Sequence, residues 1–172
     1  MNIRKVGLTA FILVLALSLI AASVLPASVL PATGFRIKKG QTTQFNLGRS
    51  GVSFTESQFT GVVRLARPDD SKFGAVNHPD FRYSLLDVRL NKSSGEKVTF
   101  VLGAVYVYFL LRPSDVRDWE HGELGLYVYD SWGNQWKECD SFLVTNHGSR
   151  PRLACRMRTF SVFGVAEKSL DN

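Results

Sequence analysis

The sequence is poor in the residues that most often carry out catalysis or hold metal ions. It has only two cysteines and three histidines among 172 residues. It also lacks a nucleophile elbow, a phosphate-binding loop, a His-Glu-x-x-His pair and a dinucleotide-binding fingerprint. These absences leave the common hydrolase, nucleotide-binding and zinc-protease classes without support, and we expect neither enzymatic activity nor a cofactor.

Metal-ligand spacing is lacking as well. The densest set of candidate ligands comprises Asp115, Asp118, Glu120, His121 and Glu123. This set has neither the alternating Asp/Asn and Gly positions of a calcium loop nor the paired histidines of a zinc site. It therefore predicts a charged connecting segment, with no metal bound.

No long block of one charge sign is present. The chain has 21 Lys and Arg residues against 15 Asp and Glu residues, but the two kinds alternate closely, as in residues 64–70 and 117–120. Such mixing is typical of a solvated surface and predicts no nucleic-acid partner. The mild basic excess favours contact with anionic cell-surface polymers or lipid headgroups.

One long hydrophobic run is present, at the N-terminus. Arg4 and Lys5 precede an apolar stretch at residues 6–20, and small residues follow at 21–23. This order predicts a secretory signal peptide at residues 1–23, and the alternative is an uncleaved membrane anchor. We therefore expect a secreted or cell-envelope location, with membrane contact only through this segment if it is not cleaved.

The remaining chain divides into three parts. Residues 24–34 are predicted to be a linker, residues 35–168 a single domain and residues 169–172 a polar tail. Two cysteines in an exported chain most simply form one disulfide, here between Cys139 and Cys155. It would close a loop of about 15 residues, which is worth about 3 kcal/mol in the chain-entropy model.

Short alternating runs separated by turn residues dominate the domain. They predict an all-β fold, a two-layer antiparallel β-sandwich of about nine to eleven short strands. Residues 104–111 are predicted to be the central strand and residues 113–119 a short helix. Residues 67–79 are expected to be a surface loop, and residues 132–165 a hairpin with a disulfide staple.

The C-terminal run resembles the end of the autoproteolysis-inducing domain of adhesion receptors and polycystin-like proteins, whose motif ends Cys-x-Cys-x-His-Leu-Thr-x-Phe. In that alignment, Cys155 and Met157 stand at the two cysteines, Thr159 at the histidine, Phe160 at the leucine, Ser161 at the nucleophilic threonine and Phe163 at the last aromatic residue. Trp136 matches a tryptophan that precedes an earlier cysteine. A second likeness, at residues 51–55 and 59–65, is to the sandwich shared by ankyrins, netrin receptors and tight-junction scaffolds.

The resemblance implies a self-cleavage reaction. The Ser161 hydroxyl would attack the preceding carbonyl, and the Phe160–Ser161 bond would be cut after an N-to-O acyl shift. Thr159 stands where the family has its general-base histidine, however, and a threonine cannot accept a proton near neutral pH. His147 would have to replace it, so we expect a non-cleaving, bacterial relative in which Trp136, Phe160 and Phe163 are structural core residues.

Three functions follow from these patterns. The first is a non-enzymatic exported module with a structural, adhesive or envelope-associated role, whose partner is a cell-envelope polymer or protein. The second is the autoproteolytic module that cleaves before Ser161. The third is a small-ligand pocket built from Tyr106, Tyr108, Trp119, Tyr127 and Trp132. Asn91 begins a glycosylation acceptor pattern, which has meaning only in a eukaryotic secretory pathway.

Overall fold

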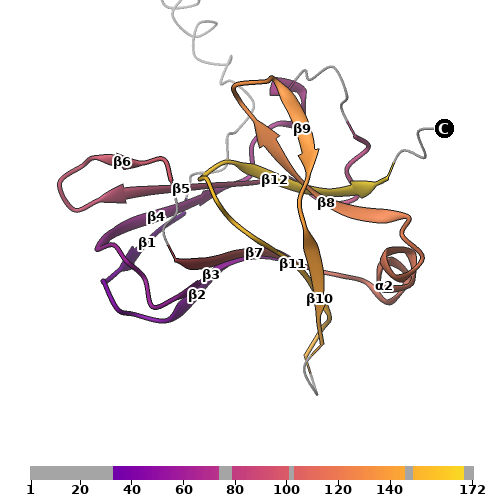
Figure 1. Cartoon of the computed structure of the whole chain (residues 1–172), viewed down its shortest axis with the longest axis horizontal. Coiled ribbons are helices and arrows are strands. Elements are labelled where there is room, and N and C mark those ends of the chain that lie inside the picture. Colours follow the sequence, from indigo (N-terminus) through magenta and orange to yellow (C-terminus); the bar gives the residue numbers. More distant parts are fainter. Residues whose placement is uncertain (1–32, 74–78, 101–102, 146–148, 169–172) are drawn as a thin grey trace, which may run out of the picture.

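Two antiparallel β-sheets packed face to face form the fold. The computed structural model describes residues 33–73, 79–100, 103–145 and 149–168. In Figure 1, β5, β12 and β8 cross the upper part of the molecule, and β2, β3 and β7 lie below them. The predicted all-β sandwich is therefore confirmed.

Twelve strands make up the two sheets within the described residues. The seven-stranded sheet has the order β1 (Thr33–Ile37), β4 (Gly61–Ala66), β5 (Leu86–Lys92), β12 (Val162–Glu167), β8 (Leu124–Asp130) and β9 (Gln135–Glu138), and β6 (Lys97–Val98) also pairs with β5. The five-stranded sheet has the order β10 (Ser141–Val144), β11 (Arg152–Arg156), β7 (Ala104–Leu110), β3 (Ser50–Thr55) and β2 (Thr43–Leu47).

The main core lies between the sheets, because alternate residues of each strand point inward. In β7, the central strand of the five-stranded sheet, Val105, Val107 and Phe109 are buried. They pack in one cluster with residues of the other sheet, among them Leu126 and Phe163. The prediction that residues 104–111 contain the central strand is confirmed.

A smaller apolar cluster, called here the outer cluster, covers the other face of the seven-stranded sheet. Its buried members are Leu85, Trp136 and Val162, against which Phe73, Phe81, Tyr127 and Tyr129 pack. Gly164 lies beneath this cover, and a Cβ atom there would stand 2.4 Å from the Phe81 ring. The sheet thus buries apolar side chains on both faces at this end.

The helix is short and begins as the sequence predicts. α2 (Pro113–Glu120) has proline in its first turn, where the missing N–H costs no helical hydrogen bond. The Asp115 carboxylate accepts a hydrogen bond of 3.2 Å from the Arg112 amide, which caps the start of the helix. A 3-10 turn, η1 (Asp70–Lys72), lies between β4 and β5.

Two details of the predicted strand pattern are wrong, and the predicted surface loop also makes a contact that was not expected. The twelve described strands exceed the predicted nine to eleven, because β10 was not expected. The predicted strand at residues 81–90 begins only at Leu86, since Leu85 belongs to the outer cluster while Leu86 enters the main core. Phe73, in the predicted surface loop, packs against Trp136 with ring centroids 5.9 Å apart.

Residues 132–165 also do not form one hairpin. β9 closes a hairpin with β8 in the seven-stranded sheet, whereas β10 and β11 form a second hairpin in the five-stranded sheet. The chain then returns to the first sheet as β12 (Figure 1). The predicted segment therefore crosses between the two sheets twice.

The predicted signal or anchor at residues 1–23, most of the linker and the polar tail lie outside the described residues. β1 begins at Thr33, two positions before the predicted start of the domain. Among the residues that the structure describes, no helix has both the length and the apolar character needed to cross a membrane.

Candidate functional site

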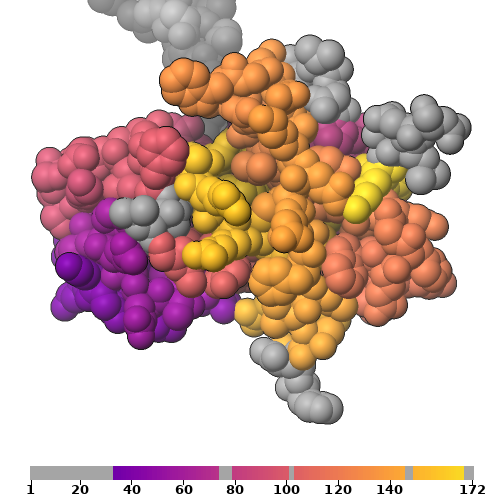
Figure 2. All heavy atoms as spheres, viewed as in Figure 1, coloured from indigo at the N-terminus to yellow at the C-terminus, as the bar shows by residue number. Residues whose placement is uncertain are grey.

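A surface depression lies where three described segments meet, and we call it the aromatic cleft. Its volume is 530 Å³, within the range of about 300–1,000 Å³ that is common for small-ligand sites. Its lining residues are Lys97, Thr99, Phe100, Val128, Tyr129, Asp130, Ser131, Trp132, Lys137, Thr159, Phe160 and Ser161. Figure 2 shows the yellow segment between β11 and β12 at the surface, between the pink β5–β6 hairpin and the orange β8–β9 hairpin.

The first wall is the turn between β8 and β9. The Asp130 carboxylate accepts hydrogen bonds from the backbone amides of Trp132 and Gly133, at 3.0 and 3.4 Å. It also pairs with the Lys137 ammonium at 2.6 Å. Lys137, followed by the two amides, lowers the pKa of Asp130. These contacts fix the backbone of the turn, while the Trp132 side chain stays 99% exposed.

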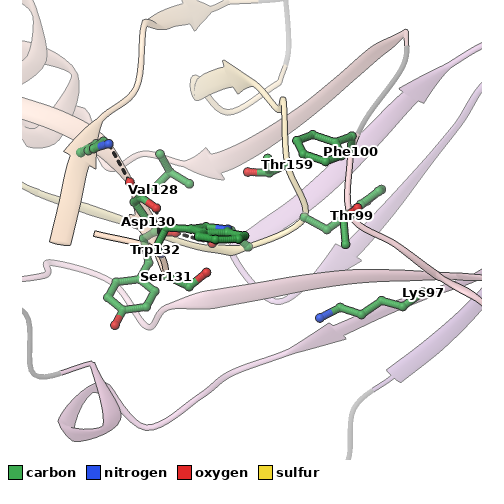
Figure 3. Close-up of a pocket in the computed structure, with 12 residues that line it drawn as sticks. Lys97, Thr99, Phe100, Val128, Asp130, Ser131, Trp132 and Thr159 are labelled. Carbon is green, nitrogen blue, oxygen red and sulfur yellow. Dashed lines mark hydrogen bonds and ion pairs between the residues drawn. The ribbon is translucent and has the colours of Figure 1, made fainter. Parts of the chain in front are cut away.

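The second wall comes from the chain that follows β6. Phe100 is 69% exposed, which is unusual for a large apolar side chain. Its backbone pairs with Thr159, and the Thr99 carbonyl accepts a hydrogen bond of 3.3 Å from the Phe160 amide. In Figure 3, Phe100 lies beside Thr159, and the indole of Trp132 extends across the cleft towards Thr99.

The floor of the cleft is the backbone at residues 159–161. The Ser161 hydroxyl donates a hydrogen bond of 2.5 Å to the Tyr129 carbonyl, and the Ser161 carbonyl accepts one of 3.0 Å from the Val88 amide. Phe160 is half-buried and packs against the main core. These contacts join the floor to β5 and β8, so both walls stand on a fixed base.

No histidine that could act as the general base for cleavage lies beside Ser161 among the described residues that line the cleft. The twelve described residues that line the cleft include no imidazole, and the nearest amine of the first wall, Lys137, is paired with Asp130. Neither Phe160 nor Ser161 has a positive φ, since only Glu56 and Asn134 have one among the described non-glycine residues. His147 lies outside the described residues. Cleavage at Phe160–Ser161 stays a prediction, which an intact-mass measurement decides.

The two cysteines lie at disulfide distance. Cys139 follows β9 and Cys155 lies on β11, and their Cα atoms are 6.2 Å apart. Cys155 is fully buried and Cys139 packs against the same core. The bond therefore links the end of the β8–β9 hairpin to the five-stranded sheet.

The other predicted structural residues lie in different clusters. Trp136 is 2% exposed in the outer cluster, whereas Phe163 is 1% exposed in the main core. The ring centroids of Trp136 and Phe81 are 4.6 Å apart. These side chains therefore pack on opposite faces of the same sheet.

The five aromatic residues of the predicted ligand pocket are not brought together. Trp132 alone among them lines the aromatic cleft, and Tyr127 packs in the outer cluster. Tyr106 stacks edge-on against Phe142, and the buried Tyr108 donates a hydrogen bond to Asn46. Trp119 packs from α2 against the main core.

Two of the acidic candidate ligands, Asp115 and Asp118, make ion pairs with Arg82. Arg82 contacts Asp115 at 3.0 Å and Glu167 at 2.7 Å, and it also pairs with Asp118. Burial opposes the charged form of Asp115, but hydrogen bonds from Tyr83, the Arg112 amide and Arg82 outweigh it and lower the pKa of Asp115. Within the described residues, no group of three or more His, Cys, Asp or Glu residues is arranged to hold a metal ion.

The sequence did not indicate the second wall or the meeting of the three segments. Val98 is buried, so simple alternation would place Phe100 inside as well. Trp132 did carry a signal, because a tryptophan at the tip of an Asp-Ser-Trp-Gly-Asn turn has little around it to bury it. That signal identifies an exposed aromatic residue but not the cleft beside it.

Comparisons of the chain with protein-family models, with curated proteins and with solved structures find no match. The likeness to the autoproteolysis-inducing domain therefore stays a prediction. The fold defines the chain as an antiparallel β-sandwich, and its candidate site rests on the geometry of the aromatic cleft.

Proposed function

We propose that this chain is an exported, non-enzymatic β-sandwich that acts as an envelope-associated interaction module and contacts its partner through the aromatic cleft. The observation that carries the proposal is the exposure of Trp132 and Phe100, at 99% and 69%, on the two walls of one depression. Exposed apolar side chains gathered around a concave site commonly mark a binding surface.

The construction of the cleft supports the proposal. The Asp130 carboxylate and Lys137 hold the turn that carries Trp132, and the pairing of Phe100 with Thr159 holds the opposite wall. Fixed walls reduce the conformational entropy that a partner must remove on binding. A site of this kind favours recognition over a reaction, which would also need a positioned acid, base or nucleophile.

The disulfide between Cys139 and Cys155 supports the location. It is compatible with an extracellular environment, because disulfides persist in oxidising compartments and are rare in the cytosol. The pattern of residues 1–23 favours export on independent grounds.

Retention of the full-length chain on cell-envelope preparations tests this function. The expected result is retention of the wild type and about tenfold weaker retention of a Trp132→Ala/Phe100→Ala variant, since aromatic residues often dominate binding energy. Phe142→Ala is the matched control, because Phe142 is 43% exposed but does not line the cleft.

Two results would contradict the proposal. One is a wild-type chain that is retained by no polymer, protein or lipid fraction of the envelope. The other is equal retention of the wild type and the Trp132→Ala/Phe100→Ala variant, which would place the contact surface elsewhere.

A further inference from the structure

We infer that the ligand of the aromatic cleft is an acidic polysaccharide, which stacks a sugar ring on Trp132 and pairs its anionic groups with basic residues along the cleft. This inference rests on the proposed function, because it names the ligand class of the same site. It is carried by the charges beside the cleft, by the continuation of the cleft into a second hollow and by the hydroxyl groups on its walls.

The second hollow, called here the basic hollow, lies next to the aromatic cleft and has a volume of 430 Å³. Its lining residues are Val128, Lys137, Glu138, Cys139, Asp140, Arg156, Met157, Arg158, Thr159 and Phe163. Val128, Lys137 and Thr159 line both depressions. The two hollows therefore adjoin each other beside the chain segment 156–161, and we treat them together as one path. A segment of six extended residues spans at most about 20 Å.

Internal ion pairs cancel part of the charge along this path. Lys137 pairs with Asp130 at 2.6 Å. Glu138 pairs with Lys168 at 2.5 Å. These two carboxylates are therefore already neutralised by amines of the chain itself.

Three exposed cations remain on the path. Lys97, Arg156 and Arg158 make no ion pair with any residue that the structure describes, and Asp140 is the one lining carboxylate that likewise makes none there. The Arg156 guanidinium makes only a long hydrogen bond of 3.4 Å, to the Gly103 carbonyl. The path therefore has an excess of positive charge that an anionic ligand would neutralise.

The chemistry of the walls favours a sugar ligand. The hydroxyls of Thr99, Ser131 and Thr159 lie among the exposed lining residues, beside the Trp132 indole. A sugar ring offers a C–H face that stacks on an indole and hydroxyls that exchange hydrogen bonds with such groups. Trp132 and Phe100 also line one hollow together, so both side chains can contact a ligand bound there (Figure 3).

The test is a titration of the full-length chain with oligomers of polygalacturonate, monitored by tryptophan emission and calorimetry. Dextran is the neutral control, and polyglutamate is the control for a polyanion without sugar rings. We expect saturable binding of polygalacturonate with a blue shift of the emission, because Trp132 is the most exposed tryptophan. Binding should weaken markedly at high salt, since exposed charges are screened.

Charge variants test which residues supply the attraction. We expect Arg156→Gln/Arg158→Gln to bind polygalacturonate about tenfold more weakly than the wild type. Arg36→Gln/Arg64→Gln is the matched control, because it removes the same charge from exposed positions on β1 and β4 that do not line either depression. Trp132→Ala should abolish the emission shift and weaken binding.

The outcomes separate this inference from the proposed function. Equal binding of dextran, or unchanged binding by Arg156→Gln/Arg158→Gln, would overturn the acidic polysaccharide while leaving a Trp132-dependent module intact. Binding of polyglutamate as tight as that of polygalacturonate, or binding only to vesicles that contain anionic phospholipid, would also overturn it. Failure of the proposed function itself is recognised separately, by the absence of retention on every envelope fraction.

Discussion

Two tryptophans on one hairpin have opposite environments. Trp136 is 2% exposed and Trp132 is 99% exposed, although only four positions separate them. Trp136 stands on β9 and is covered by the chain before β5, where Phe81 contacts it at a centroid distance of 4.6 Å. Trp132 stands in the turn beyond the end of that cover.

The difference teaches that stability and recognition are separated along the β8–β9 hairpin. Residues near the base of the hairpin belong to the outer cluster and contribute to the free energy of folding. The turn is held by Asp130, whose hydrogen bonds do not depend on the Trp132 side chain. Variants of the two tryptophans should therefore affect different properties.

The largest expected effect is that of Trp136→Ala. Loss of a buried tryptophan costs about 3–5 kcal/mol, and the melting temperature should fall by about 10 °C. Thermal unfolding followed by circular dichroism measures it, with Trp136→Phe as the milder control. A shift of less than about 2 °C would mean that the outer cluster adds little stability, and the contrast between the two tryptophans would lose its energetic basis.

The next effect is that of removing the disulfide that links the hairpin to the other sheet. Cys139→Ser/Cys155→Ser should lower the free energy of unfolding by about 3 kcal/mol, because the unfolded chain gains freedom when a loop of this length is opened. Urea denaturation measures this loss against the oxidised wild type. If the loss were absent, the two cysteines would not be bonded in the protein, and the link between hairpin and sheet would have to come from packing alone.

A smaller effect on stability is expected from weakening the contacts between α2 and the chain before β5, which covers Trp136. Asp115→Asn keeps the size of the side chain but weakens its bonds to Arg82 and Tyr83, so we expect a loss of about 1–3 kcal/mol at neutral pH. The pKa of Asp115 is lowered in the folded chain, so its contribution is present above the ordinary aspartate pKa of about 3.9 and is lost as the pH falls through the folded value.

Measuring the free energy of unfolding between neutral and acidic pH tests this expected direction of the pH dependence. The wild type should lose stability as the pH falls below about 4, and Asp115→Asn should lose less. Asp118→Asn is the comparison variant, because Asp118 shares Arg82, whereas the Tyr83 hydroxyl donates its hydrogen bond to Asp115. Parallel pH curves for the wild type and Asp115→Asn would contradict the assignment.

Much of the fold follows from local patterns in the sequence. Strand β4 alternates as expected, with Val63 and Leu65 buried and Arg64 exposed, because a half-buried strand has a period of two. The helix start at Pro113 and the central strand β7 were predicted for similarly local reasons. β10 was missed because four residues give too short a pattern to distinguish a strand from a turn.

The site was less predictable, because it depends on contacts between distant segments. Trp132, Phe100 and Thr159 come from three parts of the chain, and only the order of strands in the sheets brings them together. The same is true of the outer cluster, where the segment before β5 covers β9 and β12. Periodicity reports whether a residue points inward or outward, but it does not report which loop crosses the outer face.

The smallest effect on stability is expected for Trp132→Ala, which completes the comparison. Because the indole is 99% exposed, the free energy of unfolding should change by no more than about 0.5 kcal/mol. Binding to the envelope fraction should nevertheless fall about tenfold if the indole is the principal contact. Thermal unfolding and retention, measured on the same preparation, give both values.

Only the combination of unchanged stability and lost binding supports the separation of the two regions. A destabilised Trp132→Ala would mean that the indole supports the turn at Asp130 and Lys137, and its exposure would then have a structural purpose. A stable variant that still binds would show that exposure alone does not identify the contact residue. In that case Phe100 on the opposite wall, tested singly by Phe100→Ala, becomes the residue on which recognition through the aromatic cleft depends.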